Sequence, residues 1–225
     1  GVYGTQEILK NSIKNINFKN VKQAQSFIIP VISKDTFEST KIDKQVILNS
    51  KGKHGNIYFE LKKDDILLKK TLKQNVSFLH HFLPRFLQKK IAIVWGFIPS
   101  EFSYSYKLRK NRVLINAVNI KKKLKTLNYI SSVVNVLRER LNLIVLKQTI
   151  KLNQFARSYH VGSNIPMDLK KKKFLTTNIN GEINLPNYKN IFVSGSSVFP
   201  DLPSKSHGLT ILANSLRIGD YLNND

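Results

Sequence analysis

The sequence predicts a mixed α/β fold of the α+β kind, in which an antiparallel sheet is backed by helices. Three patterns support this prediction. Alternating apolar and polar residues over 102–108, followed by a polar turn and an apolar stretch over 113–118, predict paired antiparallel strands. Aliphatic residues recur every three or four positions over 124–141, which predicts an amphipathic helix. Small and turn-forming residues multiply after Gln154, which is typical of segments that carry ligand sites.

The N-terminal part of the chain predicts one helix followed by short strands. Residues 1–13 predict a helix with Thr5 as its N-cap. The apolar stretch 26–32 predicts a strand, and Pro30 within it favours an edge or irregular position, because proline has no N–H to donate. Further strands are expected at 46–48, 56–61 and 91–97.

Two helices and a meander are expected in the middle of the chain. Apolar residues at helical spacing predict a helix over 66–87 that ends near Pro84. The strand at 91–97 is expected to open an antiparallel meander with the two strands that follow it. The helix at 124–141 is expected to lie on this sheet. Its apolar stripe consists of Leu124, Leu127, Ile130, Val134, Leu137 and Leu141.

Composition narrows the classes of protein that the chain can represent. In 225 residues, 41% are apolar, enough to bury a core. No cysteine is present, which excludes disulfides, thiolate metal sites and thiol nucleophiles, and no histidine pair has the spacing of a zinc site. The apolar stretches are strand-sized, so no transmembrane segment is expected. The sequence indicates no compartment.

The net charge of +23 leaves two interpretations open. A phosphate-bearing partner, nucleic acid or an anionic membrane surface, would explain it. A codon bias that enriches Lys, Asn and Ile together would explain it equally. The lysines are scattered along the chain, with the densest run at 170–173, and this favours the second interpretation. No specific nucleic-acid partner is therefore expected.

Three segments of the last third carry the candidate chemistry. They are 159–163 (YHVGS), 190–200 (NIFVSGSSVFP) and 206–222 (SHGLTILANSLRIGDYL). The second predicts a buried strand at 191–193 that opens into a turn of small residues, where α/β folds admit ligands. The third predicts a helix from about residue 208, whose first N–H groups suit an anion or a polarised carbonyl. His160 and His207 could converge there on one ligand.

These segments, in this order, resemble the C-terminal signature of the glucose–methanol–choline (GMC) oxidoreductases. That signature has a His shortly before Gly-[Ser/Thr] and Met, a strand ending in Ser-Val-Phe-Pro, and a Leu-Thr-Ile helix ending in Leu-Arg-[Ile/Leu]-[Gly/Ala]-Asp. The first twelve residues are also similar to a segment of the family's flavin domain. Two features depart from the family: His160-Val161-Gly162-Ser163 is one residue shorter than the common His-x-x-Gly-[Ser/Thr], and Gly-x-Gly-x-x-Gly is absent.

The resemblance implies a domain organisation and a missing partner. Residues 1–17 and 161–225 would be segments of an FAD-binding domain, and 18–160 a substrate-binding domain with the antiparallel sheet. The dinucleotide motif would lie in an N-terminal half upstream of Gly1, and the fragment alone is expected to be inactive.

The resemblance also implies roles for individual residues. His160 would take the hydroxyl proton of an alcohol, sugar or polyol while hydride passes to flavin N5, and His207 would hydrogen-bond the same oxygen. Tyr159 and Ser206 stay open as alternatives for these two positions. The residues expected to contact FAD through backbone or side chain are Gly195, Ser196, Leu209 and Thr210.

Other interpretations stay open. The chain could be a non-enzymatic basic module for nucleic acid or anionic surfaces, or an inactive fragment. Neither the substrate, the oligomeric state nor the electron acceptor (oxygen, a quinone or another carrier) is indicated. The remaining histidines have no motif around them and are interpreted as structural: His54, His80 and His81.

Overall fold

The computed structural model describes most of the chain in eight stretches. These are residues 1–34, 43–48, 57–62, 84–109, 112–115, 120–153, 160–168 and 174–224. Several sequence predictions lie outside the described residues: most of the helix over 66–87, the lysine run at 170–173, Tyr159, His54, His80 and His81.

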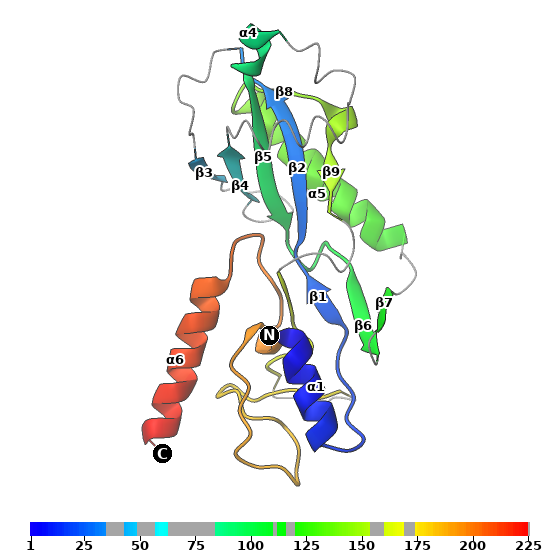
Figure 1. The fold of residues 1–225 in the computed structure, drawn as a ribbon, viewed down its shortest axis with the longest axis vertical. Coiled ribbons are helices and arrows are strands. Elements are labelled where there is room, and N and C mark those ends of the chain that lie inside the picture. Colours follow the sequence, from blue (N-terminus) through cyan, green and yellow to red (C-terminus); the bar gives the residue numbers. More distant parts are fainter. Residues whose placement is uncertain are drawn as a thin grey trace. The chain divides into compact units, whose positions relative to one another are not determined.

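The described residues form a mixed α+β fold (Figure 1). They contain three helices of 11, 20 and 17 residues and two antiparallel sheets. The α+β class expected from the sequence is confirmed. By its internal contacts the chain divides into two compact units: unit 1 comprises 1–25, 99–123 and 154–225, and unit 2 comprises 26–98 and 124–153. The assignment of segments to a flavin domain and a substrate domain stays a prediction.

Unit 1 contains a four-stranded sheet in the order β10-β1-β6-β7 and two of the long helices. The strands pair antiparallel, with Lys22 opposite Gly162 and Val21 opposite Tyr106. Its elements are α1 Val2–Ser12, β1 Val21–Gln23, β6 Ser105–Arg109, β7 Arg112–Ile115, β10 Val161–Gly162, the 3₁₀ turn η2 Ser196–Val198, and α6 Gly208–Asn224.

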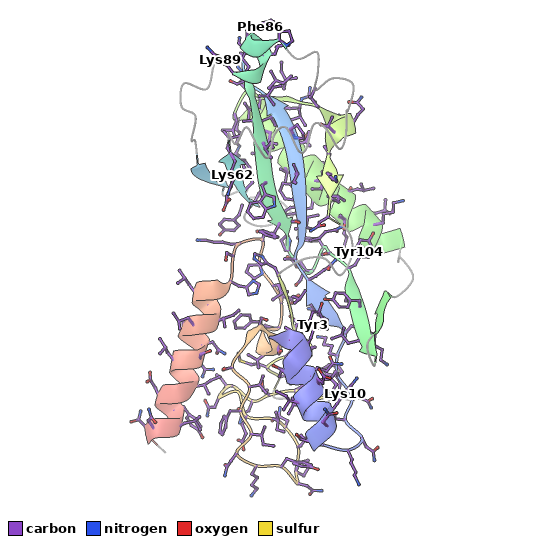
Figure 2. All side chains as sticks on the ribbon, viewed as in Figure 1. Tyr3, Lys10, Lys62, Phe86, Lys89 and Tyr104 are labelled. Atoms are coloured by element: carbon purple, nitrogen blue, oxygen red, sulfur yellow. The ribbon has the colours of Figure 1, made fainter. Side chains whose placement is uncertain are left out.

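The helix α1 is fixed to this sheet by an apolar cluster and one polar contact. Val2 packs with Val21 and Tyr106, all of them buried. Tyr3 lies on α1 (Figure 2), and its hydroxyl is 2.6 Å from that of Tyr106. Burial and this hydroxyl raise the pKa of Tyr106. The predicted N-cap was wrong: the helix is capped at Gly1, and Thr5 lies in the first turn with its hydroxyl on Gly1 O.

Unit 2 contains a six-stranded sheet in the order β3-β4-β5-β2-β8, with β9 also pairing β2. Its elements are β2 Gln25–Ile32, β3 Asp43–Leu48, β4 Ile57–Lys62, α4 Arg85–Gln88, β5 Ile91–Ile98, most of α5 Ile120–Glu139, β8 Ile144–Val145, the 3₁₀ turn η1 Lys147–Thr149 and β9 Lys151–Leu152. Pro30 falls where the partner of β2 changes: β9 lies opposite Phe27 and Ile28, and β8 opposite Val31 and Ile32.

The helix α5 packs on this sheet, as predicted (Figure 1). Near its N-terminal end, however, the predicted apolar residues are not the buried ones. Tyr129, Val133 and Leu137 are fully buried, and the Tyr129 hydroxyl lies 3.5 Å from Phe97 O in β5. The predicted stripe is confirmed from Ile130 to Leu137. It was wrong at its start, because Leu124 and Leu127 are 54% and 49% exposed.

Two other predictions about the strands were wrong. The expected meander is split, because β5 belongs to one sheet and β6 to the other. The strand expected from residue 102 begins only at Ser105, since Phe102 is held in a turn by its N–H bond to Pro99 O. The stretch 66–83 lies outside the described residues, so the helix expected to end near Pro84 stays a prediction; the single turn α4 begins directly after that proline.

The C-terminal third combines irregular chain with one regular helix. α6 begins at Gly208, as predicted. The strand expected at 191–193 was wrong, because this stretch makes only an isolated bridge between Phe192 and Glu182 within the described chain. Val193 is nevertheless buried. Among the described helices, none combines the length and hydropathy that crossing a bilayer requires.

Candidate functional site

The two histidines singled out by the sequence lie in contact within unit 1. The ring centroids of His160 and His207 are 4.7 Å apart, and the ring planes are inclined by 71°, an edge-to-face arrangement. His160 is the residue before β10, and His207 is the residue before α6. Residues far apart in the sequence thus form one small, partly buried imidazole pair.

The backbone around His160 is held between a strand and a turn. Its carbonyl accepts the N–H of Ala24 at 2.9 Å, which extends the β1–β10 ladder by one pair. On the other side, Ser163 N–H donates to Ser196 O at 3.0 Å. A Cβ at Gly162 would overlap Ser196 O, so only glycine permits this approach. The strand that carries His160 is therefore fixed directly against η2.

His207 occupies the N-cap position of α6. Its carbonyl accepts the N–H of Ile211 at 2.9 Å, the first turn of the helix. The side chain is buried, with 6% of the residue exposed, and the ring of Phe199 meets it edge-on at 6.4 Å between centroids. The neighbouring Ser206 is exposed. The ring is thus enclosed by His160 and Phe199 at the start of a helix.

Burial makes both rings poor proton acceptors from water. It lowers the pKa of His160 to about 4, with a further contribution from the charge of His207 when protonated. Burial also lowers the pKa of His207. Both imidazoles are therefore neutral at pH 7. Nδ1 of His207 is buried and has no hydrogen-bond partner among the described residues, which is an uncommon state for a buried polar atom.

A groove of about 420 Å³ lies in unit 1. One side is formed by α1 and the other by the segment 191–197. Where a side chain would begin at Gly195 there is open space, and Ser196 Oγ donates to Val161 O at 2.8 Å, in the strand that carries His160. The volume is in the range of small-molecule sites. Two of the predicted FAD contacts, Gly195 and Ser196, therefore line this groove, and Ser196 is hydrogen-bonded to the residue that follows His160.

The other two predicted FAD contacts lie in the first turn of α6. Leu209 is 83% exposed and Thr210 is also exposed. Their helix follows directly from His207, so the free N–H groups of its first turn are close to the pair in the chain. Neither residue lines the groove against α1.

The residues present fit part of a flavin dinucleotide. The open space at Gly195, the unpartnered Nδ1 of His207 and the N-terminal turn of α6 are features that a cofactor with polar and apolar parts could use. A volume of about 420 Å³ is too small to enclose a whole dinucleotide, so other residues would have to complete such a site. Within the described part of the chain, no group of three or more acidic or histidine side chains is arranged to hold a metal ion.

Sequence reasoning missed three polar residues that hold the chain between η2 and His207. Asp201 Oδ1 accepts hydrogen bonds from Lys22 Nζ and, at 3.0 Å, from Ser100 Oγ. Lys22 and Ser100 come from distant parts of the sequence and carry no motif. The one signal in the sequence that could have drawn attention to these contacts is the position of Asp201 directly after the Ser-Val-Phe-Pro motif.

Comparison with known proteins adds no assignment. No family model matches the chain, and no curated protein matches it.

Proposed function

We propose that this chain is the C-terminal part of an FAD-dependent oxidoreductase of the GMC type, which oxidises the CH–OH group of an alcohol, sugar or polyol. The observation that carries the proposal is the 4.7 Å ring contact between His160 and His207. The resemblance has both residues bind the same oxygen, which requires their rings to lie close together. Their contact supports a shared site.

The pair has the chemistry that alcohol oxidation requires. A neutral imidazole offers one nitrogen that accepts a proton and one N–H that donates a hydrogen bond. Two such rings in contact can bind one hydroxyl oxygen, with one ring receiving its proton and the other stabilising the developing negative charge. Because the pKa of His160 is about 4, this ring takes up the proton only as that charge develops. FAD, when bound, would accept the hydride.

The two open positions are assigned within this proposal. We take His207 rather than Ser206 as the second group, because the histidine is buried against His160 whereas the serine is exposed. We take His160 as the first group; Tyr159 lies outside the described residues.

Cofactor binding would be shared with the N-terminal half. Gly195 and Ser196 would contact the ribityl or pyrophosphate part in the groove. The N–H groups of Leu209 and Thr210 would face the flavin ring, where the positive end of the helix dipole favours the reduced, anionic flavin. A strand, Gly-x-Gly-x-x-Gly and a helix upstream of Gly1 would hold the remainder. The electron acceptor would be oxygen, a quinone or another carrier.

The test uses the protein expressed together with the coding sequence upstream of Gly1. The product should purify with flavin absorbance, and an alcohol or sugar from a substrate panel should bleach it anaerobically. His160→Ala should retain flavin and lose on the order of 10²–10⁴-fold in the rate of bleaching, the usual contribution of a general base. His207→Ala should also slow bleaching, whereas Lys205→Gln, an exposed neighbour, serves as the control.

Several outcomes would contradict the proposal. Full activity in His160→Ala would exclude this ring as the base. Loss of activity in Ser206→Ala, with full activity in His207→Ala, would move the second position by one residue. An upstream sequence without a dinucleotide motif, combined with a product free of flavin, would exclude the function itself.

A further inference from the structure

The segment between η2 and α6 lies across one face of the β1–β10 ladder. Lys22 and Gly162 are directly opposite each other, so they share a face, and His160, two residues before Gly162, lies on that same face. Gly162 contacts η2 at Ser196, Lys22 donates to Pro200 O at 2.9 Å, and His160 contacts His207 at the end of the segment. The segment is thus held at its start, its middle and its end.

The contact in the middle is a polar node around Asp201. The carboxylate oxygen Oδ1 accepts from Lys22 Nζ and from Ser100 Oγ. The same Ser100 hydroxyl accepts the N–H of Leu202 at 2.8 Å, and Ser100 N–H donates to Leu202 O at 2.9 Å. Ser100 is 4% exposed, and its bond with the N–H of Leu202 is shielded from water. Three hydrogen bonds therefore tie a turn of the segment to the loop that follows β5.

The hydrogen bonds around Asp201 are better suited to fix the conformation of the chain there than to add to the free energy of folding. The side chains of Lys22 and Asp201 are 21% and 54% exposed, and a pair of this exposure contributes little to the free energy of folding. The hydrogen bonds are directional, however, and they hold the turn between Phe199, which meets the ring of His207, and His207 itself. A change in the turn would be transmitted to that ring.

We propose that Asp201 is a positioning residue for the histidine pair: together with Ser100 and Lys22 it fixes the 199–202 turn and thereby keeps the ring of His207 against that of His160. The importance of this for catalysis rests on the proposed function, whereas the effect on the two rings does not.

The test observes the rings in the chain labelled with ¹⁵N-histidine. The chain has five histidines. The signals of His160 and His207 are those that disappear in His160→Gln and in His207→Gln, respectively. In Asp201→Ala we expect the proton–proton NOEs between the rings to disappear. We also expect His160 to bind protons about tenfold more tightly, a rise of one pKa unit, because water reaches the ring. Asp201→Asn keeps an oxygen that accepts from Ser100, so it should show the NOEs between the rings and the low pKa of His160 as the wild type does.

Two further variants separate positioning from a general loss of structure. Ser100→Ala removes the shielded hydroxyl and should reproduce the effect of Asp201→Ala. Glu101→Gln removes an exposed acid next to Ser100 and should leave the rings unchanged. The proposal is overturned if Asp201→Ala and Ser100→Ala lower only the melting temperature and leave the ring NOEs and titration as they are. If Asp201→Ala does not fold, Ser100→Ala alone decides the question. No flavin or alcohol enters this measurement, so its result stands apart from the enzyme assay.

Discussion

At the scale of single residues, the edge-to-face contact of His160 and His207 creates a group whose protonation the fold suppresses. Burial is the larger cause for His160, and the nearby second imidazole adds to it because two positive rings in contact repel each other. The imidazole of His207 therefore adds to the burial that keeps His160 neutral. A histidine that removes a hydroxyl proton must itself be neutral beforehand.

This suppressed protonation predicts a pH dependence of stability. The pKa of His160 is about 4 in the folded protein and about 6.5 in the unfolded chain, so between these values the unfolded chain binds more protons. The free energy of unfolding should therefore fall as the pH is lowered from 6.5 to 4, and this contribution is fully present above 6.5. Each pKa unit corresponds to about 1.4 kcal/mol. Partial solvent access reduces the total, and we expect a loss on the order of 1–2 kcal/mol.

Urea unfolding at about pH 7 and about pH 4.5 measures this contribution. His160→Gln should lose less stability than the wild type over this interval, because the variant has no ring to protonate. Lys205→Gln should behave as the wild type. Equal losses in the wild type and His160→Gln would mean that the ring is not suppressed in the folded state.

At the scale of elements, α6 has two apolar faces, of which one is buried and the other exposed. On one face Ile218 is buried and packs against Gly181, while Asn214 donates to Ser194 O at 3.2 Å. On the other face Leu212 and Leu216 are 56% and 61% exposed. A helix that is apolar all round normally has both faces covered. In this structure only the first face anchors the helix to unit 1.

The difference between the two faces predicts different costs of truncation. Ile218→Ala removes buried methyl groups and should lower the free energy of unfolding by about 2–4 kcal/mol. Leu212→Ala removes exposed apolar surface and should change it by less than about 0.5 kcal/mol. Denaturant unfolding of both variants measures the two costs. A large cost for Leu212→Ala would show that another molecule covers this face in solution.

At the scale of the whole molecule, the excess of basic over acidic side chains is the dominant property. With 37 basic and 14 acidic residues, most lysines have no acid to pair with. Ion pairs among the described residues include Lys22–Asp201 and Lys62–Glu60. Such a chain attracts polyanions without any dedicated site. Charge by itself therefore does not distinguish an enzyme from a nucleic-acid-binding module.

The charge predicts binding to DNA that depends on salt and not on sequence. Affinity for a short duplex should fall steeply between about 50 and 200 mM salt, because counterions are released on binding. Duplexes of unrelated sequence should bind equally well, as fluorescence anisotropy would show. A preference of about 10³-fold or more for one sequence would instead support the basic-module interpretation.

Local patterns in the sequence determined which stretches become regular elements. The start of α6 at Gly208 and the strand β5 were predicted from apolar spacing and turn residues alone, because these signals act between near neighbours. The same signals failed where actual burial or a competing local turn decides the outcome. Leu124 fits the stripe of α5 but is exposed, and Phe102 fits a strand but is held in a turn by Pro99.

The sequence also identified His160 and His207 as candidates, but only the tertiary structure brought them together. Their contact depends on the close approach of Gly162 to Ser196 and on the bonds around Asp201, which join segments distant along the chain. No periodicity or spacing encodes such contacts. Which stretches become helices and strands follows largely from interactions between near neighbours in the sequence. The distance between the two rings follows instead from how the whole unit packs.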